Sequence, residues 1–121
     1  MATLLVNTGK AVVTNRIKGS GTEPNYVAWG TGAGTTALTD TTLFTETGSR
    51  TTGTQSQQTT TTTNDTYQVT GTTTAGGTLA ITNAGIFDAS TSGNLFAKGD
   101  FSTINLSSGD SIAFTFKVQF T

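Results

Sequence analysis

The side chains that could carry acid–base chemistry in this chain are a few carboxylates. Asp88, Asp100 and Asp110 all stand at predicted turns. Two carboxylates can serve as acid and base in glycoside hydrolysis, and turn carboxylates can help to bind calcium. However, turn aspartates more often accept hydrogen bonds from their own backbone, and the spacing of a calcium-binding loop is absent. The sequence therefore predicts neither a catalytic pair nor a metal site.

Histidine and cysteine are absent from all 121 residues. A Ser-His-Asp or Cys-His arrangement needs an imidazole to move the proton, and zinc sites need thiolates or imidazoles. The glycine-rich stretch 30–36 lacks the lysine with which a phosphate-binding loop reaches its ligand, so it is interpreted as a structural turn. We expect no enzyme activity and no cofactor.

Two aromatic residues offer a binding alternative. Tyr26 and Trp29 could form a platform on which a sugar stacks, which would make the chain a carbohydrate-binding module. Core packing of a strand is the simpler interpretation of such residues. The two interpretations differ in whether the indole of Trp29 is exposed.

Charge is scarce. Asp, Glu, Lys and Arg make up 11% of the residues, against about 25% in typical soluble domains. The 6 basic residues are scattered, which disfavours nucleic-acid binding. No apolar run is long enough to span a bilayer, and the start lacks the pattern of a secretion signal. A nearly neutral surface repels other copies weakly and favours association.

The elements expected around these residues are mostly strands, in a single β-rich domain over 1–121. Residues 1–6 form an N-terminal arm or short strand, and residues 7–18 form a helix capped by Asn7 or Thr8 and ended by Gly19. Residues 25–121 are predicted to form an antiparallel β-sandwich or a jelly-roll-like barrel.

Two segments illustrate the strand pattern. Apolar and polar residues alternate strictly from Ser111 to Phe120, which predicts a strand with one face in the core. Residues 51–63 and 66–74 are rich in threonine, which favours strands, and Asn64-Asp65 is a turn signal. We predict a long hairpin with threonine-covered outer faces, although the low complexity of 51–63 also fits disorder.

Two stretches resemble small virion proteins of tailed bacteriophages. The first runs from Val27-Ala28-Trp29-Gly30-Thr31-Gly32 through Asp40-Thr41-Thr42-Leu43 to Glu46. The second is Ile81-Thr82-Asn83-Ala84-Gly85-Ile86-Phe87-Asp88-Ala89 followed by Gly93-Asn94-Leu95-Phe96-Ala97-Lys98, with Asn83 where those proteins more often have Glu. The resemblance covers most of the chain from Asn7 onward.

The resemblance implies a capsid decoration (cement) protein, a small β-sandwich or jelly-roll unit that bridges neighbouring subunits of the major capsid protein. It would be a homo-oligomer, often a trimer, made in the host cytoplasm and placed on the outer capsid surface of the virion. Related hairpins occur in tail-collar and tail-fibre proteins, so a tail component is the alternative. The candidate contact residues are Thr3, Leu4, Leu5, Val6, Thr59, Thr60, Thr61, Thr62 and Thr63.

Overall fold

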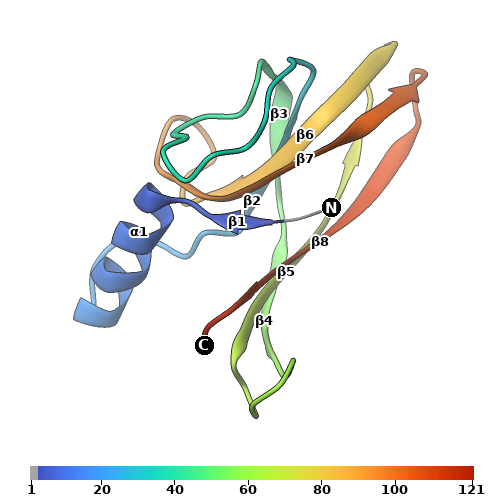
Figure 1. The fold of residues 1–121 in the computed structure, drawn as a ribbon. Coiled ribbons are helices and arrows are strands. Elements are labelled where there is room, and N and C mark those ends of the chain that lie inside the picture. The colour runs from blue at the N-terminus through green and yellow to red at the C-terminus, as the bar shows by residue number, and fades with distance from the viewer. Residues whose placement is uncertain (1–2) are drawn as a thin grey trace.

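The computed structural model describes residues 3–121, which form eight strands and one helix (Figure 1). In chain order the elements are β1 (Leu4–Leu5), α1 (Asn7–Lys18), β2 (Tyr26–Gly30), β3 (Glu46–Thr52), β4 (Thr54–Gln58), β5 (Thr66–Thr74), β6 (Leu79–Phe87), β7 (Leu95–Leu106) and β8 (Ser111–Gln119).

The strands form two antiparallel sheets that face each other. The first sheet has the order β1-β7-β6-β2-β3, and the second has the order β4-β5-β8. The arrangement is sandwich-like and open, so the predicted mainly β fold is confirmed and a closed barrel is not formed. β1 adds to the sandwich at the edge of the first sheet, where Leu4 pairs with Lys98. The sandwich therefore begins earlier in the chain than residue 25.

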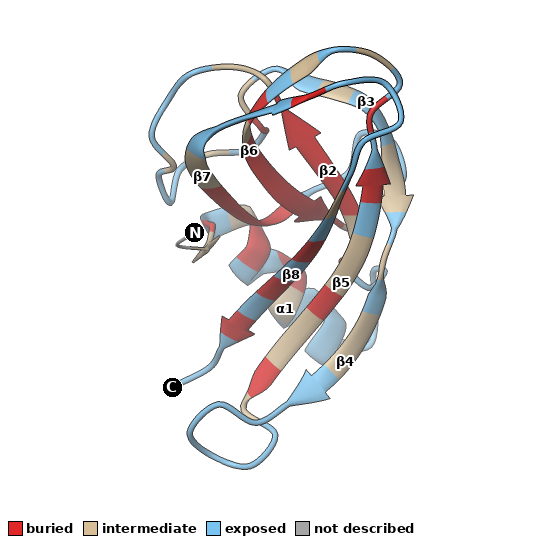
Figure 2. Cartoon of the chain, turned by 90° about the vertical axis from the view of Figure 1, so that its right-hand side faces the viewer, coloured by how far each residue is buried: buried red, intermediate tan, exposed pale blue. Residues whose placement is uncertain are grey.

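The main core lies between the two sheets, where the buried faces of both meet (Figure 2). Trp29 of β2 packs edge-on against Phe114 of β8, with ring centroids 6.3 Å apart. Phe114, Phe116 and Val118 of β8 are buried and the residues between them are exposed, which confirms the predicted alternation. Phe120 breaks the pattern, since it follows the end of β8 and is 45% exposed.

A smaller core lies on the other face of the first sheet, beneath the loop 31–45. Its buried members are Val6, Ala28, Leu43, Phe87 and Leu95. The first sheet is thus covered on both faces, which explains why β2 is buried from Val27 to Gly30 instead of alternating.

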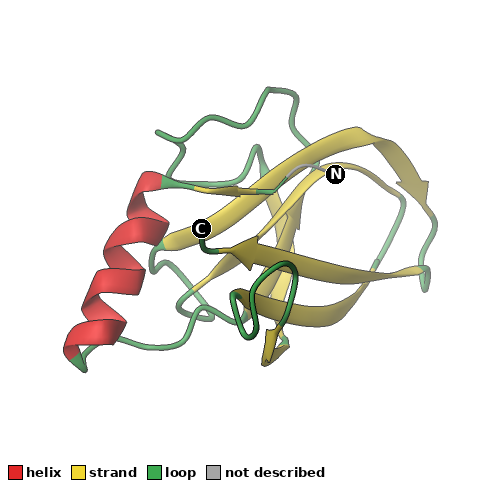
Figure 3. Ribbon diagram, turned by 60° about the horizontal axis from the view of Figure 1, so that its bottom comes forward, coloured by secondary structure: helices red, strands yellow, loops and turns green. Residues whose placement is uncertain are grey.

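The helix forms where it was predicted, but its start is capped differently. The N-cap position is Val6, and neither Asn7 nor Thr8 caps the first turn with its side chain. The Thr8 hydroxyl instead donates to the carbonyl of Leu95, 2.6 Å away, and so ties the helix to β7. Gly19 ends the helix with φ 98°, as predicted. α1 lies at one side of the strands (Figure 3) and contacts β7.

The predicted threonine hairpin is correct in part. β4 and β5 form a hairpin, but Thr51 and Thr52 belong to β3 and pair with β2 in the other sheet. The chain passes between the sheets at Gly53, where a Cβ would lie 2.8 Å from the carbonyl oxygen of Thr70. Thr59–Thr63 form the connecting loop and no strand.

Candidate functional site

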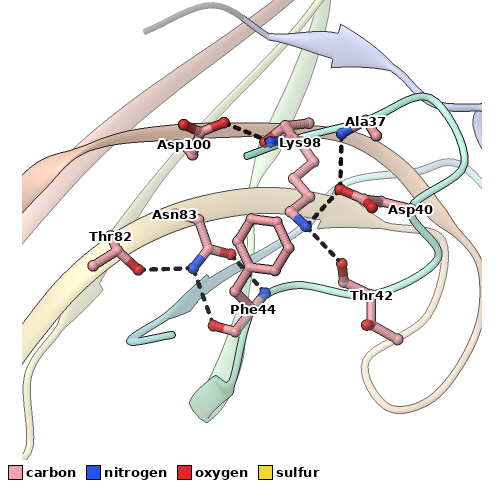
Figure 4. Close-up of polar contacts among 9 residues, drawn as sticks. Ala37, Asp40, Thr42, Phe44, Thr82, Asn83, Lys98 and Asp100 are labelled. Atoms are coloured by element: carbon pink, nitrogen blue, oxygen red, sulfur yellow. Dashed lines mark hydrogen bonds and ion pairs between the residues drawn. The ribbon is translucent and has the colours of Figure 1, made fainter. Parts of the chain in front are cut away.

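A buried polar cluster joins the loop 31–45 to β6 and β7. Lys98 of β7 is fully buried under the loop 31–45 (Figure 4). Its Nζ donates to Asp40 Oδ2 at 2.9 Å and to the carbonyl of Thr42 at 3.0 Å. The same ammonium group lies 3.2 Å from the ring centroid of Phe44. One lysine thus holds three residues of the loop against the sheet.

Asn83 of β6 fixes the end of the same loop. Its Oδ1 accepts the backbone N–H of Phe44 at 3.0 Å, and its Nδ2 donates to the carbonyl of Phe44 at 3.0 Å. The Asn83 amide thereby mimics the backbone of a neighbouring strand, which a carboxylate could not do because it cannot donate. Asn83 therefore has a structural role here.

The main interaction in this cluster is an ion pair between Lys98 and Asp40 that is largely shielded from solvent. Burial works against the charge of Asp40, but the N–H of Ala37 and the ammonium of Lys98 outweigh it and lower the pKa of that carboxyl. Lys98 has no exposed surface through which a substrate could reach its amine. The cluster therefore fastens a loop, with the Lys98 amine shielded from solvent and the Asp40 side chain 20% exposed. The cluster was not predicted from the sequence, although a lysine directly after the apolar residues 95–97 was an available signal.

The three aspartates considered for catalysis are separate in the structure. Asp88 and Asp110 lie at turns and accept the backbone N–H groups of Asn94 and Ser107, as turn aspartates were expected to do. Asp100 lies within β7 and not at a turn, and it accepts the N–H of Thr36 in the loop 31–45. Among residues 3–121, no group of three acidic, histidine or cysteine side chains is placed to hold a metal ion.

Tyr26 and Trp29 do not form one platform. Trp29 is 2% exposed and belongs to the core between the sheets, whereas Tyr26 packs on the smaller core on the opposite face. Neither face of the indole is open to a sugar. The structure thus agrees with core packing of Trp29 and disagrees with stacking of a ligand on both rings.

The threonine tract forms a loop organised by one carboxylate. Asp65 accepts the backbone N–H groups of Thr60, Thr61 and Thr62 at 2.8–3.2 Å, and its side chain also receives Gln119 Nε2 at 2.9 Å. The N–H groups of Thr62 and Thr60, followed by Gln119, lower the pKa of Asp65 strongly. Asn64 has φ 60°, which confirms the predicted turn.

The candidate contact residues therefore fall into two groups. Thr59–Thr63 are all exposed. Thr3, Leu4 and Leu5 are half-buried, and Leu4 and Leu5 pair with β7, whereas Val6 is fully buried in the smaller core. Val6 was wrongly included, because its side chain is buried in the smaller core and cannot reach a partner.

Beside the threonine loop lies an apolar groove that was not predicted from the sequence. Its volume is about 220 Å³, and its lining includes Val13 and Ile17 of α1, Tyr67 of β5, and Phe120. Ile17 is 81% exposed. Tyr67 donates to the carbonyl of Pro24 at 2.9 Å. Burial, with a contribution from the nearby Glu23, raises the pKa of Tyr67 to about 12, so this residue stays neutral.

The groove and the loop meet at Phe120, which also lines a second hollow with Asn64 and Asp65. We call this region the loop-end surface and define it by Ile17, Tyr67, Phe120 and Thr59–Asn64. Two of the residues lining the groove, Arg16 and Glu23, pair with each other at 3.2 Å, and Asp65 is hydrogen-bonded within its loop. The loop-end surface therefore combines apolar side chains of the groove with uncharged polar residues of the loop.

Asp65→Asn is expected to loosen the threonine loop. An amide carries no charge and has one acceptor oxygen instead of two, so it cannot hold three N–H groups and the Gln119 amide together. Limited proteolysis at neutral pH should cut the variant within 59–64 at least tenfold faster than the unchanged chain, while cleavage elsewhere stays the same.

The same loop should respond to acid. The folded-state pKa of Asp65 is lowered, so its stabilising effect is present above the unfolded value of about 3.9 and is lost as pH falls further. Cleavage by an acid-active protease should rise below about pH 4 in the unchanged chain and stay flat in Asp65→Asn. A flat profile in both chains would contradict this role of Asp65.

Comparison with known proteins adds no relative: no family model, no curated protein and no solved structure matches the chain. Within residues 3–121, the structure contains no helix that combines the length and apolarity needed to cross a membrane.

Proposed function

We propose that this chain is a non-enzymatic structural protein of a phage virion that decorates the capsid and bridges subunits of the major capsid protein. The observation that carries the proposal is the loop-end surface, where the exposed residues Ile17 and Phe120 line a groove beside the uncharged residues Thr59–Asn64. The resemblance of residues 27–46 and 81–98 to phage virion proteins supports it.

The loop-end surface suits a contact that is weak for each copy and repeated many times. Burying apolar area contributes about 25 cal/mol per Å². Threonine hydroxyls in the Asp65-ordered loop can donate to and accept from a partner, and little ordering entropy remains to be lost because the loop is already folded. A homo-oligomer would make several such contacts with a symmetric shell at once, and these contacts strengthen each other through high effective concentration.

The buried cluster around Lys98 has a supporting role in this proposal. It fastens the loop 31–45 to the first sheet, and the smaller core under that loop includes Val6 and Leu95. Because Thr8 of α1 also bonds to Leu95, the helix that carries Ile17 is held by the same part of the fold. The cluster would therefore keep the loop-end surface in shape without touching the partner.

The copy number in purified virions tests the proposal. On the order of hundreds of copies per particle, measured on a stained gel, would support a place on the shell, whereas about six or fewer would support the tail component that the same motifs allow.

A matched pair of variants tests the surface itself. Phe120→Asp puts a charge into the groove, and Leu38→Asp puts one at an equally exposed position in the loop 31–45, since Phe120 is 45% and Leu38 46% exposed. Phe120→Asp should lower binding to particles that lack the protein by at least tenfold, because a carboxylate resists burial. Leu38→Asp should bind like the unchanged chain. Equal binding of the two variants, with equal thermal stability, would rule out the loop-end surface.

A further inference from the structure

The two sheets expose four edges, and one of them is unguarded. Strand edges with free N–H and C=O groups invite pairing with another strand, so proteins shorten, bulge or charge them. β1 has two residues and β4 has five. β3 and β7 are interrupted by register shifts, at Gly48 to Arg50 and at Phe101 to Thr103. β8 has nine residues, unbroken pairing with β5, no proline and one charge, Lys117.

The backbone of β8 alternates between its two sides. Phe120 donates its N–H to the carbonyl of Asp65, and Ala75 donates to Asp110, so the even-numbered residues of β8 are those that bond to β5. The N–H and C=O groups of Ser111, Ala113, Thr115, Lys117 and Gln119 therefore point away from β5. These five residues are exposed, and exposed residues alternate with buried or half-buried ones along β8 (Figure 2). The outer edge is thus a row of main-chain groups that do not bond to β5, beside exposed side chains of which Lys117 alone is charged.

A second copy of β8 fits this row. In an antiparallel pair centred on Thr115, each Thr115 faces its own equivalent, each Ala113 faces Lys117 of the other copy, and Ser111 faces Gln119. Thr–Thr pairs are favourable across strands, and no like charges lie directly opposite each other. On the inner side, Phe114 faces Phe116, so the apolar face of one sheet continues into the next.

We propose that β8 pairs antiparallel with β8 of a second copy, which makes a two-fold dimer with one sheet running through both molecules. The contact is self-complementary, as a two-fold interface requires, and it cannot close a ring of three. The row ends at Gln119, next to Phe120 of the loop-end surface, and the pairing does not depend on the virion role.

Amide hydrogen exchange on the isolated protein at two concentrations tests the pairing at single residues. At high concentration the amides of Ala113, Thr115 and Lys117 should be protected, and on dilution they should exchange at least tenfold faster. The amides of Phe114 and Phe116 should stay protected at both concentrations, since they bond to β5. Equal exchange of the outward amides at both concentrations would overturn the proposal.

A pair of opposite charges at one exposed position tests the register. Ala113→Glu places a carboxylate opposite Lys117 of the other copy, and Ala113→Lys places an ammonium there. Measured by analytical ultracentrifugation, the dimer should be tighter for Ala113→Glu than for Ala113→Lys by roughly tenfold, because the contact occurs twice. Thermal unfolding at low concentration should be the same for both. Equal dissociation constants, a monomer at all concentrations, or a trimer would overturn the proposal.

Discussion

Lys98→Ala is expected to destabilise the fold by about 3–5 kcal/mol, the loss found when one partner of a buried ion pair is removed. The variant leaves Asp40 without its ammonium partner and leaves the carbonyl of Thr42 without a donor. It also opens a cavity under Phe44, whose ring now contacts the ammonium group. Urea unfolding followed by circular dichroism measures the loss.

Three control variants separate the causes. Lys117→Ala removes an exposed lysine from a strand and should change stability by less than about 0.5 kcal/mol. Lys98→Met keeps most of the volume, so the difference between Lys98→Ala and Lys98→Met reports the cavity. Asp40→Asn keeps an acceptor for Nζ but removes the opposite charge, and it should cost less than Lys98→Ala. If Lys98→Ala cost no more than Lys117→Ala, the cluster would not fasten the loop.

Gly9→Ala should destabilise the protein even though alanine is the better helix former. A Cβ at position 9 would lie 2.0 Å from the carbonyl oxygen of Phe96 and 2.8 Å from Leu5 Cδ1. The helix would have to move away from β7 and weaken the Thr8–Leu95 hydrogen bond. The gain in helix propensity is at most about 1 kcal/mol, whereas overpacking against backbone costs about 1–3 kcal/mol or more. We expect a net loss of roughly 2 kcal/mol, measured by urea unfolding.

Gly76→Ala is the matched control for this substitution. A Cβ at position 76 would meet no atom within 4 Å, and its φ is not in the left-handed region. It should leave the free energy of unfolding unchanged or raise it by up to about 1 kcal/mol, because alanine lowers the conformational entropy of the unfolded chain. An equal or higher stability of Gly9→Ala would mean that α1 does not pack closely on β7.

Structural features that are set by residues close together in the sequence were predicted correctly. The alternation from Ser111 to Phe120 identified β8, and Gly19 identified the end of α1, because side-chain period and backbone freedom act locally. The conformation of the threonine tract was harder to predict. Threonine favours strands, but Asp65 draws three N–H groups of the tract onto one carboxylate and bends it into a loop instead.

The start of the helix also depends on residues that are distant in the sequence. Asn7 and Thr8 were good capping residues by type, yet the Thr8 hydroxyl bonds to Leu95, 87 residues away in the chain. Val6 looked like part of a free arm, and it is buried because the loop 31–45 closes over that side of the first sheet.

The sequence by itself determined a β-rich chain without imidazole or thiol, with a short N-terminal helix and a final strand that has one apolar face. Only the tertiary structure decided which surfaces remain available for contacts with other molecules. Lys98 meets Asp40 across 58 residues, and Phe120 joins α1 and the threonine loop in one surface. Sheet order also leaves β8 at an edge. Such outcomes depend on long-range packing, whereas the spacing of residues along the chain reports only what each element prefers locally.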